Sequence, residues 1–250
     1  MLFHPIGIKV RFMASTDEAT CRLLITAGPT YEPIDAVRFI GNRSSGKLGI
    51  ALADHAQAQG WAVTLLLGPN TSQPTNPNVQ TIRFESTSDL ESLLQTHLPQ
   101  ADTLIMAAAV ADFRPPPDSV NTTDKRRREG NDWTLILEPT PDLLAGCSKL
   151  ARADQLLVGF ALEPRDRMIP SAMQKLERKK IDLIVANALE TMDSDSIEAT
   201  LLGNPDRGIS YQRSTPGKIT KASFAEWLIE HITPLTHQRM GVSTESTSNG

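Results

Sequence analysis

The chain has 250 residues, of which 40% are hydrophobic and 22% charged, with a formal net charge of −4. This length fits one large α/β domain or two small ones, and the acidic balance argues against general binding of nucleic acid or membrane surfaces. The two cysteines, Cys21 and Cys147, provide no disulfide framework, which is typical of a reducing cytoplasm. Without a long apolar run or a secretion signal, we predict a cytoplasmic protein.

Short apolar runs alternate with segments of helical periodicity along most of the chain. Residues 1–21 are read as an extension of uncertain order, with a possible isolated strand at 8–12. The domain spans residues 22–236, and residues 237–250 are predicted to be disordered. Strands are predicted at residues 22–27, 61–67, 79–84, 102–109, 133–137, 155–161 and 181–186. Helices are predicted at residues 49–59, 86–98, 141–151, 168–180 and 221–232.

This alternation predicts an α/β fold, namely a Rossmann-like doubly wound, mostly parallel sheet with helices on both faces. Residues 199–202 and 209–213 flank a turn and predict a C-terminal β-hairpin. Ligands of such sheets bind beyond the carboxyl ends of the strands. Gly28, residues 107–112, Phe160 and Asn187 end or follow strands, so they should converge on one crevice with Asn42.

The loop at residues 40–49 separates the first strand from a helix, which is how nucleotide-binding folds present backbone N–H groups to phosphate. Gly41, Gly46 and Lys47 fit the start of a P-loop. Leu48, however, stands where that motif needs Ser or Thr, so a P-loop NTPase is rejected. The dinucleotide fingerprint is also absent. An ordinary glycine turn before a helix is the simpler alternative.

Residues 114–132 contain prolines and a polar run without apolar periodicity, and we predict that they form a mobile flap. Its basic cluster at residues 125–128 could be a solvated loop or a weak nucleic-acid patch. Further along, Lys175 and Lys179 are spaced i and i+4 and lie on one face of a predicted helix. The scattered histidines have no metal-ligand spacing, and Cys147 is predicted to be a small core residue.

Several separated motifs together resemble the phosphopantothenate–cysteine ligase family. They are TAGPT (residues 26–30), NRSSGK (42–47), AAVADFR (108–114), VGFA (158–161) and the run at residues 175–187. The resemblance implies a stand-alone ligase that joins 4′-phosphopantothenate to L-cysteine in the second step of coenzyme A biosynthesis. It also implies an acyl-cytidylate intermediate formed from CTP, Mg²⁺ that accompanies the nucleotide, and a homodimer.

The same resemblance assigns roles to individual residues. Asn42 would contact the acyl intermediate through its amide, and Lys125 would act from the flap, in which arginines replace lysines that are frequent in the family. No metal ligand is expected. The nucleotide would be bound by Gly28, Ser44, Gly46, Met106, Ala107, Ala108, Asp112, Pro141, Asp142, Leu143, Leu144, Phe160, Lys175 and Lys179.

Two other functions are considered. An NAD(P)-dependent Rossmann-type oxidoreductase would need the missing fingerprint and an acidic residue at the end of the second strand, which instead ends in Leu67, Gly68 and Pro69. A catalytically silent nucleotide-binding relative is the second alternative. The presence of Asn42 and of the lysines argues against it.

Overall fold

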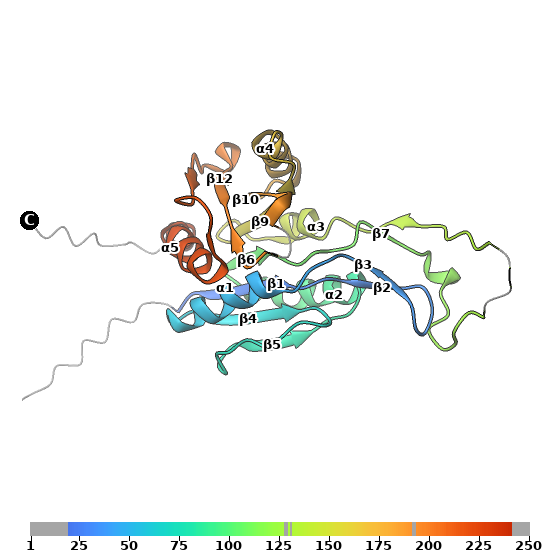
Figure 1. The fold of residues 1–250 in the computed structure, drawn as a ribbon. Helices are drawn as coiled ribbons and strands as arrows, with labels where there is room; N and C mark the ends of the chain where they lie inside the picture. Colours follow the sequence, from blue (N-terminus) through green and yellow to red (C-terminus); the bar gives the residue numbers. More distant parts are fainter. Residues whose placement is uncertain (1–19, 128–129, 131, 192–193, 242–250) are drawn as a thin grey trace, which may run out of the picture.

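The structure, a computed structural model, describes residues 20–127, 130, 132–191 and 194–241. An eight-stranded sheet in the order β13-β12-β10-β9-β6-β1-β4-β5 forms its centre (Figure 1). The strands of this sheet are β1 (Arg22–Ala27), β4 (Ala62–Leu67), β5 (Gln80–Arg83), β6 (Thr103–Met106), β9 (Leu156–Glu163), β10 (Leu183–Ala188), β12 (Ala199–Gly203) and β13 (Gln212–Ser214). The helices are α1 (Lys47–Ala58), α2 (Thr87–His97), α3 (Leu143–Leu150), α4 (Met168–Lys179) and α5 (Lys221–Met240).

The sheet is doubly wound. From β5 across to β10 every neighbouring pair of strands is parallel, whereas β12 runs antiparallel to both β10 and β13. The chain winds from β1 outward through β4 and β5, then returns to β6 beside β1 and winds the other way. The predicted fold class, including the C-terminal hairpin, is confirmed.

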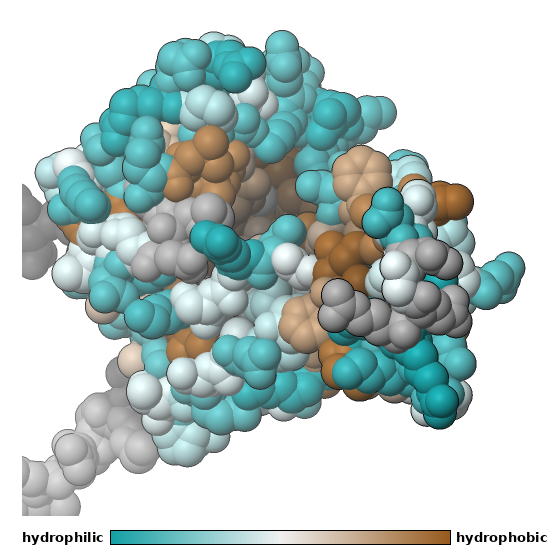
Figure 2. Space-filling view, turned by 45° about the vertical axis from the view of Figure 1, so that its right-hand side comes forward, coloured by the Kyte–Doolittle hydropathy of each residue, from teal (hydrophilic) through white to brown (hydrophobic). Residues whose placement is uncertain are grey.

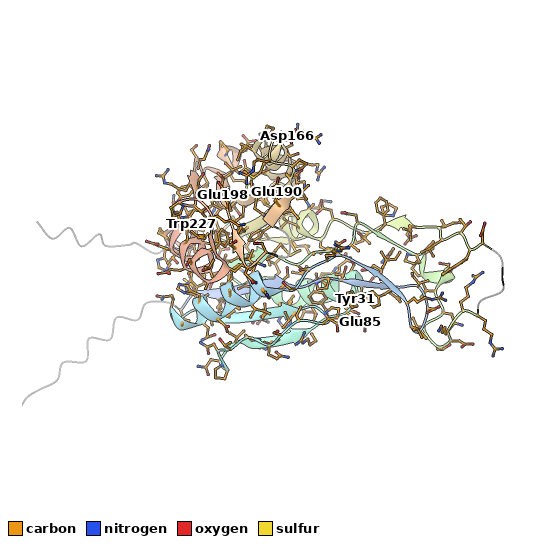
Figure 3. All side chains as sticks on the ribbon, viewed as in Figure 1. Tyr31, Glu85, Asp166, Glu190, Glu198 and Trp227 are labelled. Atoms are coloured by element: carbon orange, nitrogen blue, oxygen red, sulfur yellow. The ribbon has the colours of Figure 1, made fainter. Side chains whose placement is uncertain are left out.

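Alternating apolar residues on each strand build two cores, one on each face of the sheet. Leu23 and Ile25 of β1 pack on the face covered by α1 and α5, where Trp227 of α5 is seen in Figure 3. Leu24 faces the opposite core, beneath α2, α3 and α4. Both faces of β1 are buried, as expected for a central parallel strand.

Beside the main sheet, two short strand pairs form an arm that projects from the body (Figure 1). We use "arm" for the described residues within 31–41 and 113–139. It holds β2 (Tyr31–Pro33) paired with β3 (Phe39–Gly41), and β7 (Phe113–Arg114) paired with β8 (Glu138–Pro139). A further small pair joins β11 (Ser196–Ile197) to β14 (Ile219–Thr220).

Asp35 organises the arm from its buried position. Its carboxylate accepts hydrogen bonds from the Arg38 side chain and from the N–H groups of Val37 (3.0 Å) and Arg126 (3.2 Å). The hydrogen bond from Arg38, above all, holds the pKa of Asp35 well below its usual range. The guanidinium groups of Arg38 and Arg126 lie over the Trp133 ring, 5.1 and 4.8 Å from its centroid.

The structure differs from the sequence-based expectations in two segments and contains one strand pair that was not expected. Residues 133–137 form no strand but an exposed part of the arm, in which Ile136 is 72% exposed. The loop after β1 contains the unexpected β2–β3 pair. Residues 237–240, expected to be disordered, belong to α5, because Thr236 hydrogen-bonds Thr103 (2.8 Å) and Arg239 pairs with Asp182. The possible strand at residues 8–12 and the tail at 242–250 lie outside the described residues.

A buried carboxylate attaches the end of α5 to the sheet. Asp182, fully buried just before β10, accepts hydrogen bonds from Arg239 Nη2 (2.6 Å), Arg207 Nε (3.1 Å) and the N–H of Leu157 (2.8 Å). Both arginines keep some solvent exposure, so their own desolvation is incomplete. The network joins α5, β9 and the β12–β13 turn.

We expect Asp182→Asn to lower the free energy of unfolding by about 3 kcal/mol, because it leaves two partly buried guanidinium groups without a counter-charge. Urea unfolding followed by circular dichroism measures this difference. Asp206→Asn, at an exposed neighbouring position, is the matched control and should stay close to the parent. Equal unfolding midpoints for the two variants would contradict the role of Asp182.

Candidate functional site

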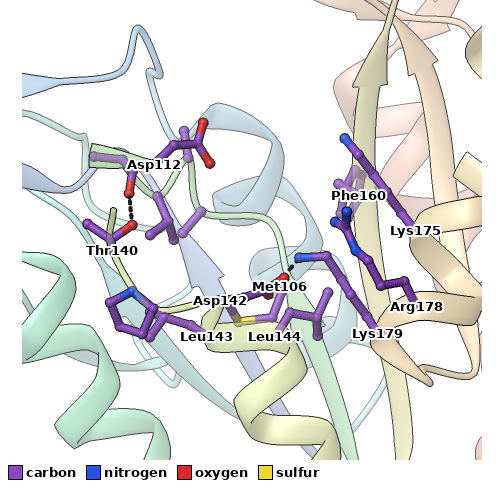
Figure 4. Close-up of a pocket in the computed structure, with 15 residues that line it drawn as sticks. Met106, Asp112, Thr140, Asp142, Leu143, Leu144, Phe160, Lys175, Arg178 and Lys179 are labelled. Carbon is purple, nitrogen blue, oxygen red and sulfur yellow. Dashed lines mark hydrogen bonds and ion pairs between the residues drawn. The ribbon is translucent and has the colours of Figure 1, made fainter. Parts of the chain in front are cut away.

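Two adjoining cavities open at the carboxyl ends of the parallel strands. The first has a volume of about 350 Å³, and Figure 4 shows its walls, which come from the segment after β6, from α3 and from α4. The second, of about 250 Å³, lies between the start of α1 and the ends of β9 and β10. Ala108, Ala109 and Phe160 line both cavities, so the two spaces meet along this shared wall.

The cavities lie where the direction of winding reverses, between β1 and β6. Here the segments that follow β1 and β6 continue side by side. The N–H of Ala107 donates to the carbonyl of Thr26 (3.1 Å), and the N–H of Ala109 donates to the carbonyl of Gly28 (2.9 Å). The alanines keep side chains small along this wall. This is the crevice in which doubly wound sheets bind their ligands.

The start of α1 forms one side of the second cavity. Gly46 precedes the helix with a φ of 69°, and a Cβ there would lie 2.8 Å from Thr71 Cγ2. No side chain caps this helix end, and its first turn carries no acidic residue. The positive end of the helix dipole therefore faces a cavity that also has Arg43 and Lys221 in its lining, an arrangement that favours anions.

Asn42 lines neither cavity, but it is exposed and hydrogen-bonds to the wall beside them. Its amide Nδ2 donates to the carbonyls of Val110 (2.9 Å) and Ala109 (3.4 Å), and Ala109 is part of the shared wall. These bonds fix the plane of the carboxamide. The Asn42 oxygen can then accept a hydrogen bond from a ligand beside this wall.

The far wall of the first cavity is cationic. Lys175, Arg178 and Lys179 extend into it from α4 (Figure 4). Lys179 Nζ contacts Asp142 Oδ1 at 2.6 Å, and Lys175 pairs with Glu163. Three cations on one helix face suit a ligand with several negative charges.

Asp142 both caps α3 and pairs with Lys179. Its side chain caps α3 by accepting from the N–H of Ala145 at 3.1 Å. Burial acts to raise the pKa of Asp142, but the hydrogen bonds from Lys179 and Ala145 and the nearby positive charges outweigh it and lower that pKa. Asp142 is therefore an anion at neutral pH and carries the charge that pairs with Lys179.

The structure brings most of the residues predicted from the sequence together. Met106, Ala108, Asp112, Pro141, Asp142, Leu143, Leu144, Phe160, Lys175 and Lys179 line the first cavity; Ser44, Gly46, Ala107, Ala108 and Phe160 line the second. Gly28 lies against Gly46. Lys125 lines neither cavity: it lies on the arm, where its N–H donates to the Asp124 carboxylate (2.8 Å).

Sequence reasoning missed Arg178 and Thr140 in the first cavity and Lys221 in the second. Arg178 could have been found, because it follows Lys175 at helical spacing on the same face. Thr140 gave no such signal: its hydroxyl donates to the carbonyl of Ala111, a contact made only by the fold.

Neither cysteine chemistry nor a protein metal cage is suggested by the described residues. Burial, assisted by the negative charge of Asp142, raises the pKa of Cys147 to about 12, so the thiol stays protonated and packs in the core. Among the described residues no three His, Cys, Asp or Glu side chains come together to hold a metal ion. The described helices also include none that could cross a membrane.

Comparison with known proteins gives consistent matches over this region. The family model described as the DNA/pantothenate metabolism flavoprotein C-terminal domain matches residues 19–235. The coenzyme A biosynthesis bifunctional protein CoaBC of Mycobacterium tuberculosis is 40% identical over 199 residues, which are 75% of this chain and 47% of that protein. A protein named cysteine/cysteine sulfinic acid decarboxylase, from an unknown prokaryotic organism, is 39% identical over 221 residues. These are 86% of this chain and 59% of that protein.

The chain thus spans only about half the length of these curated relatives. Among solved structures, the C-terminal domain of CoaBC superposes with a TM-score of 0.71 at 32% identity, covering 87% of this chain and 96% of that domain. A Cab2 variant in complex with phosphopantothenate-cysteine has a TM-score of 0.72 at 19% identity over 88% of each chain, which shows a shared fold.

Proposed function

Because the chain belongs to the DNA/pantothenate metabolism flavoprotein C-terminal domain family, we propose that it is a ligase that joins 4′-phosphopantothenate to L-cysteine, with CTP converted to CMP and pyrophosphate. This would be the second step of coenzyme A biosynthesis. The observation that carries the proposal is the pair of adjoining cavities, one lined by cations of α4 and the other by the start of α1, with Asn42 hydrogen-bonded to Ala109 of their shared wall.

The chemistry requires an activated acyl group, because a free carboxylate has no adequate leaving group. In the first step a carboxylate oxygen attacks the α-phosphorus of CTP, the bond to the β-phosphate breaks, and pyrophosphate leaves. In the second step the cysteine amine attacks the acyl carbon of the mixed anhydride and loses a proton. The acyl C–O bond then breaks, and CMP leaves with the oxygen that came from the carboxylate.

The two cavities together would hold the nucleotide. The cations of α4 and the start of α1 would neutralise the triphosphate, and the backbone of residues 106–108 would approach the base. Mg²⁺ would arrive with the triphosphate, since the described residues offer no cage for it. Lys125 would need to reach this nucleotide from the arm, so its catalytic role stays a prediction.

Asn42 would position the acyl group between the two steps. Its two N–H donors are bound to the Ala109 and Val110 carbonyls, so its oxygen is held in place and can accept a hydrogen bond from the incoming amine. Asp112, an exposed carboxylate of the first cavity, would bind nucleotide hydroxyl groups from the opposite side.

The direct test measures pyrophosphate release with 4′-phosphopantothenate, L-cysteine and each nucleoside triphosphate in turn. We expect release that requires 4′-phosphopantothenate and is fastest with CTP. No release with any triphosphate, together with a rise in the thermal unfolding midpoint on adding NADH, would contradict the ligase function and favour an NAD(P)-dependent oxidoreductase.

We expect Asn42→Asp to lose about 100-fold in amide formation, while the acyl-cytidylate still accumulates. An aspartate cannot donate to the two carbonyls, and its charge is repelled by them, so the second step loses its geometry. Quenched-flow chromatography of CMP, intermediate and product measures both steps. Asn78→Asp, at an exposed loop position, is the control. Full amide formation by Asn42→Asp would remove Asn42 from the mechanism.

The arm would form the interface of a homodimer. In the turned view of Figure 2, hydrophobic residues are exposed among hydrophilic ones on the face that carries the arm. Val37, Phe39, Phe113 and Ile136 are 48–72% exposed there. A second copy offers the same apolar arm and could cover it by two-fold symmetry.

We expect Ile136→Glu to shift the protein from dimer to monomer at micromolar concentration, because it buries a charge in the proposed interface. Sedimentation velocity measures the change. Leu150→Glu, 64% exposed on α3 and away from the arm, should leave the dimer intact. A monomeric parent protein, or an Ile136→Glu variant that stays dimeric, would exclude this interface.

A further inference from the structure

Glu163 has no assigned role, and we propose that it is a positioning residue that holds the ammonium group of Lys175 at the wall of the first cavity. The proposal rests on the proposed function, in which this cavity binds a nucleoside triphosphate. Glu163 would act through Lys175 and would not touch the nucleotide itself. Sequence analysis gave no indication of this pair.

The pair joins two elements of the fold. Glu163 is the last residue of β9, on the strand that also carries Phe160 into both cavities, and its side chain is only 13% exposed. Lys175 lies on α4 and pairs with it directly. For comparison, the nearby Arg165–Glu198 pair spans 3.2 Å with side chains 58% and 45% exposed. Because solvent screens the Lys175 pair less, its geometry is better fixed.

The position of Glu163 decides whether it assists or opposes an anionic ligand. Lys175 lines the first cavity, whereas Glu163 lines neither cavity. The carboxylate therefore lies behind the ammonium group and not in the space that the phosphates would occupy. An ammonium group has three N–H donors, so one can bind Glu163 while the others remain available to phosphate oxygens.

The second lysine of the same helix face is held in a matching way. Lys179 pairs with Asp142 at the start of α3, on another wall of the cavity. A lysine side chain has a long flexible stem that loses rotamer freedom when it binds a ligand. Carboxylates on β9 and α3 would order both stems before the nucleotide arrives, so less freedom is lost on binding.

The test compares Glu163→Gln with the parent enzyme in CTP titrations. We expect the KM and Kd for CTP to rise about tenfold while kcat changes less than twofold, because the amide leaves Lys175 free to adopt other rotamers. Glu163→Asp keeps the charge and should recover part of the affinity. In a Lys175→Met background, Glu163→Gln should have no further effect on the Kd for CTP.

Glu198→Gln is the matched control, because it removes a carboxylate from an exposed ion pair on the surface (Figure 3). It should leave CTP binding unchanged. An unchanged or lowered KM in Glu163→Gln, or an additive loss in the double variant, would overturn the proposal. If Glu163→Gln does not fold, the same titration of Glu163→Asp decides, since an affinity equal to the parent counts against positioning. A parent enzyme that binds no CTP would instead overturn the proposed function.

Discussion

The site depends on how closely the start of α1 approaches the end of β1. A Cβ at Gly49 would lie 2.4 Å from the Cβ of Ala27, so the helix can pack at this distance only without a side chain there. Gly46 makes the left-handed turn that leads into the helix. With α1 in this position, the loop at residues 42–46 faces the alanines after β6, and the second cavity lies between them. A larger residue at Gly49 would push the helix end outward and shift the loop that carries Asn42.

The site also needs positive charge concentrated at the first cavity on side chains that are held in place. The fold meets this need by drawing cations from α4 and carboxylates from elements that pack against it, so that each lysine pairs with an acid from β9 or α3. Arg178 adds a third cation on the same face. The arm uses the same principle around Asp35, where one buried carboxylate orders Arg38 and the backbone of Arg126.

Features that depend on a local pattern could be predicted from the sequence. Features that depend on contacts between distant segments could not. Alternating apolar runs were sufficient for the doubly wound sheet, and the strand-end residues Gly28, Ala107 and Phe160 followed from the topology. Residues 133–137 are apolar enough for a strand, yet they lie exposed on the arm. The contacts of Glu163 with Lys175, and of Asn42 with Val110, join segments that no periodicity relates. Lys125, which the sequence analysis placed in the segment at residues 114–132, lies on the arm that contains this segment.

The most direct test of the account follows an oxygen atom. The protein would be given CTP, L-cysteine and 4′-phosphopantothenate labelled with ¹⁸O in its carboxylate, and the CMP would be analysed by mass spectrometry. If the carboxylate attacks the α-phosphorus beside Asn42, one ¹⁸O atom appears in each CMP formed. Unlabelled CMP, or label found in inorganic phosphate beside CDP, would contradict the acyl-cytidylate and with it the proposed use of the two cavities.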